Sequence, residues 1–447
     1  LVTGLAQVQA EVPGSPIFLM KFAAEARHLE VQLLGDVYGN AIAVHGRDCS
    51  VQRRHQKILE EGPVAVAPPE IWREMERKAV KLCKEVAYHA AGTVEYLYAN
   101  GEYTFLELNP RLQVEHPVSE WISGINLPAC QVLVTMGVPL FGIPEIRAHY
   151  GQETDSVRPF DIDTLDPQPD GHVIAARITA ENPNDGFKPN SGSIKELFFR
   201  SAPNCWGYFS IGGVGGIHEF ADSQFGHVFA RGKTRDEARR TMITALKEIS
   251  IRAELRCSVE YLIMLLESET FASDTHDNAW LDGLIATGVL SSKLDDNVAV
   301  LVAAGYQAFV LTEDVVSNFG ALLERGQSPP PDMLNLTCAF EFIYEGMKYR
   351  ISAFRTSPDA VAIHVGESGQ MIEVAIRKLA DGGFLICLGG ASHVVYAFQE
   401  IEGLRLTIDG LSCIFPHEYD PSVLRVSMPG KLARFLVASG SHVRKGD

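Results

Sequence analysis

The chain contains, at residues 105–116, the stretch FLELNPRLQVEH, in which polar and apolar residues alternate. In an extended chain, side chains two residues apart point to the same side of the strand. The polar residues at alternate positions are Glu107, Asn109, Arg111, Gln113 and Glu115, whereas the leucines and Val114 between them are expected to face the core. An ordinary amphipathic strand also has a polar face. Two carboxylates combined with amides and a guanidinium on one face nevertheless indicate a ligand site.

A further carboxylate, Glu95, lies in the preceding run 93–98, which a turn containing Asn100 and Gly101 joins to 103–108. A two-residue loop would place Glu95 and Glu107 on opposite faces, whereas a three-residue loop, residues 100–102, pairs them. We predict the three-residue loop. Two adjacent carboxylates repel each other unless a cation lies between them, and Glu95, Glu107 and Asn109 offer oxygen ligands that suit Mg²⁺ or Mn²⁺ better than zinc. The hairpin therefore predicts a magnesium-nucleotide site.

A concentrated cationic segment, RDCSVQRRHQK, occupies residues 47–57 of an acidic chain. Its local charge suits nucleotide phosphates or a small anion. The candidate ligand contacts in it are Gln52, His55 and Lys57. A solvated charge run is the alternative interpretation, and we interpret Arg53 and Arg54 as partners in structural salt bridges. His28, taken alone, is more typical of a structural histidine than of a ligand contact.

The composition is that of a globular protein with 447 residues, 46% hydrophobic residues and a mean hydropathy of +0.03. A net charge of −17 disfavours nucleic acid as a partner. No apolar run approaches the roughly 20 residues of a membrane helix, so no membrane span is expected. The eight cysteines form no C-x-x-C pair, which favours a reducing compartment.

The clearest linker is QSPPPD at residues 327–332. Beyond it, residues 340–415 change to short β runs separated by glycine pairs, which is typical of a separate antiparallel domain.

Several segments together resemble the biotin carboxylase domains of the ATP-grasp superfamily. They are RHLEVQLLGD, RDCSVQRRHQK, AGTVEYLY, FLELNPRLQVEHPV and GHVIAARITAENP, in this order. Two later segments, NCWGYFSIGGVGGIHEFADSQFGHVFA and LKEISIRAELRCSVEYLIMLLE, are similar to the acetyl-CoA carboxylases of eukaryotes, which are multidomain enzymes. The segment LADGGFLICLGGASHVVY resembles their β-barrel region, and the residues from 420 onward resemble the start of a biotin carboxyl carrier domain.

The resemblance implies an α+β fold, in which the C-terminal half of an ATP-grasp domain and the biotin carboxylase C-terminal domain precede an antiparallel β-barrel. The expected divisions are a partial ATP-grasp domain at 1–150, the biotin carboxylase C-terminal domain at 151–270, a helical connecting segment at 271–339, the barrel interaction domain at 340–420 and a truncated biotinyl carrier domain at 421–447.

Site residues follow from the resemblance position by position. The metal ligands fall on Glu95, Glu107 and Asn109, and the nucleotide contacts on His28, Gln52, His55 and Lys57. The catalytic set is Glu115, Arg111, Arg177 and Lys57, with Glu115 as the base that deprotonates bicarbonate and Arg177 as the cation that stabilises the biotin enolate. Bicarbonate would be held by Arg111, Gln113 and Val114. Taken alone, Arg177 would be interpreted as a surface salt bridge with Glu181.

The implied activity is the ATP- and bicarbonate-dependent carboxylation of biotin, which leads to malonyl-CoA for fatty acid synthesis. It requires ATP with Mg²⁺ or Mn²⁺, and biotin on a carrier lysine absent from this chain. The implied partners are bicarbonate, a biotinyl carrier domain, a carboxyltransferase domain and a second copy in a homodimer. The expected location is the cytoplasm, with the plastid as the alternative.

The glycine-rich lid of the family would lie upstream of Val12, where no matching residues occur. We therefore expect this polypeptide alone to be weakly active or inactive, because phosphoryl transfer needs groups on all sides of the phosphate. The alternatives are another biotin-dependent acyl-CoA or pyruvate carboxylase, a non-catalytic truncated product that binds carboxylase subunits, and an ATP-grasp ligase without biotin, which the barrel and carrier-like segments disfavour.

Overall fold

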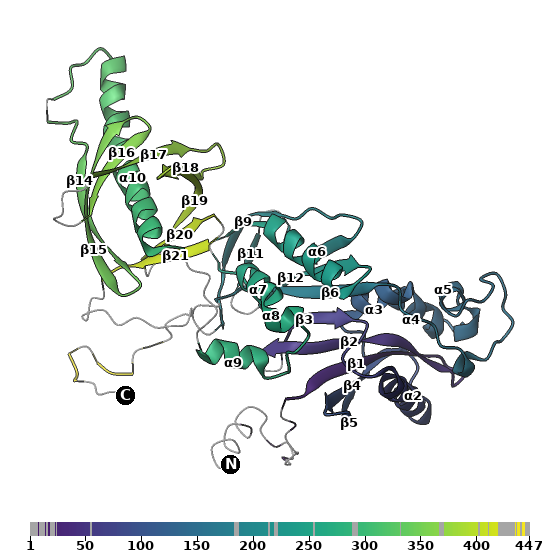
Figure 1. Cartoon of the computed structure of the whole chain (residues 1–447). Helices are drawn as coiled ribbons and strands as arrows, with labels where there is room; N and C mark the ends of the chain where they lie inside the picture. The colour runs from purple at the N-terminus through teal and green to yellow at the C-terminus, as the bar shows by residue number, and fades with distance from the viewer. Residues whose placement is uncertain are drawn as a thin grey trace.

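The computed structural model describes residues 25–418, apart from short gaps, and isolated positions near both ends. The gaps are at 54–55, 183–186, 213–214, 219–221, 254, 288–293, 331, 366–370, 401–402 and 410. His55, Arg54 and most of the expected carrier segment 421–447 therefore lie outside the described residues. Figure 1 shows a mixed helix and sheet unit beside a barrel, which confirms the expected fold class.

One eight-stranded antiparallel sheet runs through the mixed unit in the order β10-β12-β6-β3-β2-β1-β4-β5. Its strands are β1 (Arg27–Gly35), β2 (Ala41–Arg53), β3 (Gln56–Gly62), β4 (Ala91–Ala99), β5 (Glu102–Asn109), β6 (His172–Thr179), β10 (Cys205–Phe209) and β12 (Gln224–Gly232). Because β3 pairs with β6, the sheet is continuous across the expected division at residue 150. The ATP-grasp and C-terminal parts thus share one scaffold.

The sequence of β1 explains how the sheet carries a polar site on one face. Its odd-numbered apolar residues, Leu29, Val31 and Leu33, pack in one core with helix α2 (Pro69–Glu85). Even-numbered polar residues alternate with them and lie on the other face, as the two-residue period of a strand requires. That face is covered by α3 (His116–Ser123) and α4 (Leu127–Thr135), with α5 (Pro144–His149) beyond them.

The rest of the mixed unit packs on the β6 side of the sheet. It contains a three-stranded sheet, β11-β9-β13, and a short β7-β8 pair. The strands are β7 (Glu181–Asn182), β8 (Lys188–Pro189), β9 (Gly192–Phe198), β11 (Gly215–Ile217) and β13 (Ser250–Ala253), and the helices are α6 (Arg235–Glu248), α7 (Val259–Glu267), α8 (Glu269–Ala272) and α9 (Trp280–Thr287). Short 3-10 turns occur at Leu140–Gly142 and Ile162–Thr164.

The second unit is an antiparallel meander that curls around one long helix, α10 (Asp296–Glu324). Its strands are β14 (Thr337–Tyr344), β15 (Met347–Ser357), β16 (Ala360–Val365), β17 (Met371–Lys378), β18 (Phe384–Leu388), β19 (Ala391–Glu400), β20 (Gly403–Ile408) and β21 (Leu411–Pro416). The two end strands meet through side chains, where the Tyr344 hydroxyl donates to Cys413 Sγ at 3.7 Å and the Tyr344 and Phe415 rings stack with centroids 4.9 Å apart. The meander is therefore nearly closed.

The position of helix α10 differs from the expected domain boundary between residues 339 and 340. Its first half forms a single core with all the surrounding strands, so it belongs to the barrel rather than to a connecting segment. The proline-rich linker then joins α10 to β14 within the same unit. Among the helices of the described residues, α10 alone is long and apolar enough to cross a membrane, and half of its most apolar window is buried inside this fold. Such burial is typical of a core helix.

Close packing against Glu30 and Trp72 requires a glycine at position 46 in β2. A Cβ at this position would overlap the Glu30 carbonyl oxygen and the Trp72 ring. We expect Gly46→Ala to lower the free energy of unfolding by about 1–3 kcal/mol, the usual cost of overpacking. Urea unfolding would measure the loss. Gly142→Ala is the matched control, because its nearest neighbouring atom would lie 3.5 Å away, and a loss equal to that of the control would contradict the prediction.

Candidate active site

The β4-β5 hairpin pairs Glu95 with Glu107, as expected, but by a different route. Ala99 pairs with Glu102, so the loop consists of two residues, both with positive φ (52° for Asn100 and 82° for Gly101). The predicted three-residue loop is wrong, because Asn-Gly favours the tight two-residue turn. A shift in register between Glu95 and Tyr96 then inserts one extra residue in β5. This bulge restores the pairing of the two carboxylates.

The predicted continuous strand through residue 115 is also wrong. Strand β5 ends at Asn109, directly before Pro110, which has no backbone N–H to continue the ladder. Arg111 is exposed, and its guanidinium donates to the Leu112 carbonyl at 3.4 Å, its one hydrogen bond to the residues that the structure describes. Val114, expected in the core, is 37% exposed. The structure therefore does not bring these two predicted bicarbonate contacts into the cluster described below.

Glu95 lies at the centre of the polar face and is 4% exposed. One oxygen accepts a hydrogen bond from His28 Nε2 at 2.7 Å, and the other accepts from Gln113 Nε2 at 2.9 Å and from Lys57 Nζ at 3.2 Å. Burial raises the pKa of Glu95, but the hydrogen bond from His28 and the charge of Lys57 outweigh burial and lower the pKa to about 2. Glu95 is therefore ionised at neutral pH.

Glu115, at the N-terminus of α3, is held between two cations. Lys57 Nζ donates to Glu115 Oε1 at 2.7 Å, and Arg177 Nη2 from β6 donates to Oε2 at 3.0 Å. Burial raises the pKa of Glu115, as does the charge of Glu30, but Lys57 and Arg177 outweigh both and lower it. The alternative interpretation of Arg177, a surface salt bridge with Glu181, is wrong, since Arg177 pairs with Glu60 and Glu115 while Glu181 pairs with Arg53 at 2.8 Å. The structural interpretation of Arg53 is thereby confirmed.

Three further buried residues, Glu30, Arg47 and Glu60, complete the cluster. They were not predicted as site residues from the sequence. Glu30 is fully buried, pairs with Lys57, and accepts from Arg47 Nη2 at 2.8 Å. Glu60 is also fully buried and accepts from Arg177 Nε at 2.6 Å. The polar residues at every second position of β1 were the available signal for Glu30. The sequence signal for Glu60, in the run KILEEG, was weaker.

The charges of this cluster leave room for a cation. Four buried carboxylates (Glu30, Glu60, Glu95 and Glu115) face the buried Arg47 and the partly buried Lys57 and Arg177, and His28, whose pKa is raised, lies against Glu95. The exposed Glu107 adds another negative charge, so the carboxylates outnumber these cationic groups. Asn109 Nδ2 bridges Glu95 Oε1 at 2.8 Å and Glu107 Oε1 at 2.9 Å, so these three side chains converge. Turning the Asn109 amide over presents its oxygen instead. The residues thus fit a hard divalent cation.

The nucleotide contacts expected on this face are partly assembled. His28 and Gln52 lie together, with His28 Nδ1 3.4 Å from Gln52 Oε1. Burial lowers the pKa of His28, but the hydrogen bond to Glu95 and the charge of Glu30 raise it overall. His28 is therefore integrated with the carboxylate cluster rather than buried apart from it.

Three family models match the chain along its length. The ATP binding domain of the carbamoyl-phosphate synthase L chain matches residues 2–142, the biotin carboxylase C-terminal domain matches 175–283, and the acetyl-CoA carboxylase BT domain matches 295–416. Among solved structures, biotin carboxylase from Campylobacter jejuni aligns with a TM-score of 0.55 and 27% identity over 63% of this chain and 58% of that one. Together with the site, these matches define the biotin carboxylase class of ATP-grasp proteins.

Comparison with individual proteins of similar sequence indicates a narrower family within this class. Acetyl-CoA carboxylase from Dictyostelium discoideum is 52% identical over 100% of this chain and 20% of its own length. The Saccharomyces cerevisiae enzyme is 48% identical over 98% of this chain and 20% of its length. The chain belongs to the acetyl-CoA carboxylase family and spans about a fifth of the length of these relatives.

Proposed function

We propose that this chain provides the metal, ATP and bicarbonate part of a biotin carboxylase active site, within an ATP-dependent ligase that forms malonyl-CoA from acetyl-CoA. The observation that carries the proposal is the buried carboxylate of Glu115, held ionised between Lys57 and Arg177. Such a group can accept a proton, and the two cations beside it can bind an anion. The 2-oxoglutarate carboxylase domain from Hydrogenobacter thermophilus, which was solved with MgADP and bicarbonate, supports these ligands (29% identity, TM-score 0.53, 59% of this chain and 54% of that one).

The proposed role of Glu115 follows from its competition with the substrate. Bicarbonate, as an anion, would attract the same two cations that now hold the carboxylate. As Lys57 and Arg177 turn toward bicarbonate, they would stabilise the ionised form of Glu115 less, so its pKa would rise. The carboxylate would then be a stronger base at the moment when the bicarbonate oxygen attacks the γ-phosphate of ATP.

Arg177 would stabilise negative charge that develops on the acceptor. Its guanidinium is anchored by Glu60 at 2.6 Å, and Glu60 accepts a second hydrogen bond from His227 Nε2 at 3.1 Å. These hydrogen bonds to Glu60 fix the orientation of the Arg177 guanidinium, whose Nη2 still points at Glu115. Biotin would supply the ureido nitrogen that accepts the carboxyl group.

Glu95, Glu107 and Asn109 would hold Mg²⁺ or Mn²⁺, which neutralises nucleotide phosphates when bound. We expect Glu107→Gln to weaken Mn²⁺ binding, measured by electron paramagnetic resonance in the presence of ADP, by at least the roughly 10–100-fold seen for supporting residues of metal sites. Glu102→Gln is the matched control, because Glu102 is an exposed residue of the same strand outside the converging carboxylates. Equal affinities of the two variants would refute the assignment.

We extend the proposal to partners and location. The 2-oxoglutarate carboxylase domain was solved as a dimer, which supports a homodimer here. A biotinyl carrier domain and a carboxyltransferase domain would act with this site in the complete reaction. All eight cysteines are free thiols, which supports a reducing compartment and hence the cytoplasm, with the plastid as alternative.

A further inference from the structure

A turn in the biotin carboxylase C-terminal part lies against the start of strand β1. It consists of residues 274–278, between helices α8 and α9, and its Asn278 N–H donates to the Ala26 carbonyl at 2.9 Å. Arg27 Nη2 pairs with the Asp274 carboxylate, and Nη1 donates to the Asp274 carbonyl at 3.4 Å. Asp274 has a positive φ of 58°, a conformation that costs energy for a residue with a side chain. Contacts with β1 therefore help to hold the turn in place.

Arg27 is buried, and all three of its guanidinium nitrogens are paired. Besides the bonds to Asp274, Nη1 donates to the His276 carbonyl and Nε donates to Asp48 Oδ2 at 2.9 Å. Burial lowers the pKa of Arg27, but the charges of Asp48 and Asp274 outweigh burial and raise it. The guanidinium is thus a permanent cation that joins one carboxylate from β2 with one from the turn.

Asp48 extends this contact to the expected nucleotide residues. Asp48 Oδ1 accepts a hydrogen bond from the Ser50 hydroxyl at 2.5 Å, and Ser50 Oγ accepts the backbone N–H of His28 at 2.9 Å. His28 Nδ1 in turn lies 3.4 Å from Gln52 Oε1. A continuous path of hydrogen bonds therefore leads from the turn, through Arg27, to two residues inferred to contact the nucleotide.

The start of β1 has an incomplete ladder on the side of β2. Strand β4 pairs with β1 from Arg27 onward, whereas the pairing with β2 begins only at Leu29. Strand ends open more easily than strand centres, because fewer backbone hydrogen bonds hold them. Among the described residues, the Ser50 hydroxyl and the pair of Arg27 with Asp48 connect this end of β1 to β2. A weaker hold by Arg27 would therefore allow His28 to move.

We propose that Arg27 is a positioning residue for the nucleotide, because it holds the turn 274–278 against β1 and so keeps His28 and Gln52 in their binding positions. The proposal rests on the proposed function, since it takes these two residues as contacts of ATP or ADP. Coupling between two sites is reciprocal, so a bound nucleotide should in turn stabilise the turn. Arg27 makes its bonds outside the active-site cluster, and the effect is therefore expected on nucleotide affinity rather than on the chemical step.

Hydrogen exchange of the unmodified full-length protein tests the coupling directly. With saturating MgADP, the amides of residues 274–280 should exchange several-fold more slowly, because the Asn278 N–H is bonded to Ala26 only while the turn is in place. Residues 379–383, a turn of the barrel, are the control and should be unaffected. Titration calorimetry should accompany the exchange. Absence of ADP binding would contradict the proposed function and this inference with it, whereas ADP binding without slower exchange at 274–280 would overturn this inference alone.

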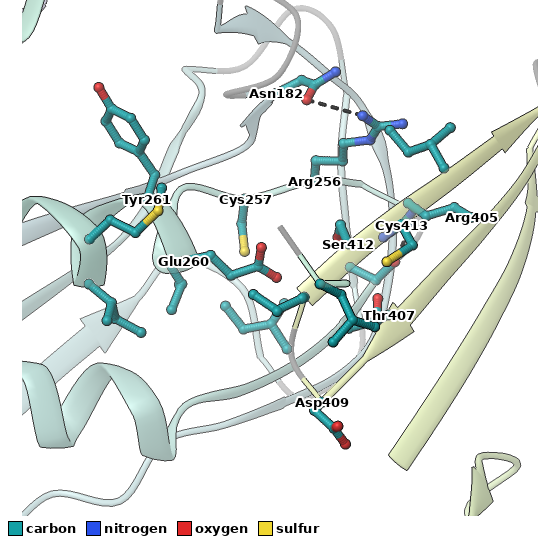
Figure 2. Close-up of a pocket in the computed structure, with 18 of the residues that line it drawn as sticks. Asn182, Arg256, Cys257, Glu260, Tyr261, Arg405, Thr407, Asp409, Ser412 and Cys413 are labelled. Carbon is teal, nitrogen blue, oxygen red and sulfur yellow. Dashed lines mark hydrogen bonds between the residues drawn. The ribbon is translucent and has the colours of Figure 1, made fainter. Parts of the chain in front are cut away.

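Arg256 offers a matched control variant, because it also joins segments that are distant in the chain. Its Nη1 donates to Asn182 Oδ1 at 3.1 Å, as Figure 2 shows, and its Nη2 donates to Glu400 Oε2 of the barrel at 3.3 Å. It lines a cavity of about 940 Å³ to which neither Arg27 nor the expected nucleotide residues contribute. Arg256→Met should therefore leave the Michaelis constant for ATP unchanged.

Arg27→Met should raise the Michaelis constant for ATP in bicarbonate-dependent ATP cleavage by about tenfold or more, the order of one lost hydrogen bond to a charged group. The turnover number kcat should change by less than about threefold. Arg27→Lys keeps the charge but cannot reach three acceptors at once, so it should recover part of the affinity.

Asp274→Asn loosens the same contact from the side of the turn and serves if Arg27→Met does not fold. It keeps the shape of the side chain and should raise the Michaelis constant for ATP by about threefold. If Arg27→Met or Asp274→Asn had the same constant as Arg256→Met, or lost activity through kcat alone, the positioning role of Arg27 would be refuted.

Discussion

Glu115→Gln is expected to reduce bicarbonate-dependent ATP cleavage by the full-length protein by about 10²–10⁴-fold, the usual contribution of a positioned general base. The substitution keeps the shape of the side chain but removes its ability to accept a proton. The Michaelis constant for ATP should change less than the rate, because Lys57 is the one expected nucleotide residue, among those that the structure describes, to which Glu115 is bonded, whereas His28 lies against Glu95 and Gln52 lies against His28. Steady-state kinetics with varied ATP and bicarbonate would separate the two effects.

Glu120→Gln is a matched control from the same helix. The Glu120 carboxylate accepts the backbone N–H of Leu127 at 2.6 Å and lies outside the active-site cluster. Because Glu115→Gln also leaves two cations with one partner fewer, thermal unfolding of both variants should accompany the kinetics. A folded Glu115→Gln variant with more than a tenth of the unmodified rate would contradict the assignment of Glu115 as the base.

The hairpin shows which part of the site could be predicted from the sequence. The pairing of Glu95 with Glu107 was predicted correctly, and the loop was not, because a two-residue loop and a bulge together give the same pairing as a three-residue loop. The Asn-Gly turn is a strong local signal. The bulge depends on how β5 packs against its neighbours, and no single residue marks it.

The prediction that the strand continues beyond Asn109 was wrong, although the sequence contains the local reason why it ends there. Pro110 interrupts the ladder, so the two-residue alternation no longer fixes the direction of the side chains that follow. Gln113 and Glu115 still reach the cluster, because the chain turns there and α3 begins at His116. Arg111, in contrast, remains exposed on the turn.

Helix α10 was placed outside the barrel because its position depends on contacts distant in the sequence. The run from Val298 to Leu311 is apolar on nearly all sides, a pattern that indicates a buried helix. The sequence does not indicate which strands surround it. Strands far along the chain supply those contacts, for instance through Val374 and Ile376, which approach Gly305 to within 3.3 Å of where its Cβ would be.

Arg47→Met is expected to have the largest effect on stability, lowering the free energy of unfolding by about 3–5 kcal/mol, the usual cost of removing one member of a buried ion pair. The guanidinium is fully buried and donates to Gln32, Glu30 and Gln113 at 2.8 Å each and to Ser119 at 3.0 Å. Methionine fills similar space but leaves the Glu30 charge with Lys57 as its remaining cation. Urea unfolding and hydrogen exchange of β1 and β2 would measure the loss.

Arg47→Lys separates the charge from the geometry. Lysine keeps the positive charge but lacks the planar fork that joins β1, α3 and the loop at Gln113, so it should recover only part of the stability. Arg77→Met, at an exposed position of α2, is the control and should change stability by less than about 0.5 kcal/mol. If Arg47→Met cost no more than this control, the buried cluster would be held together by Lys57 and Arg177, and the loop carrying Gln113 and Glu115 would be positioned by α3 alone.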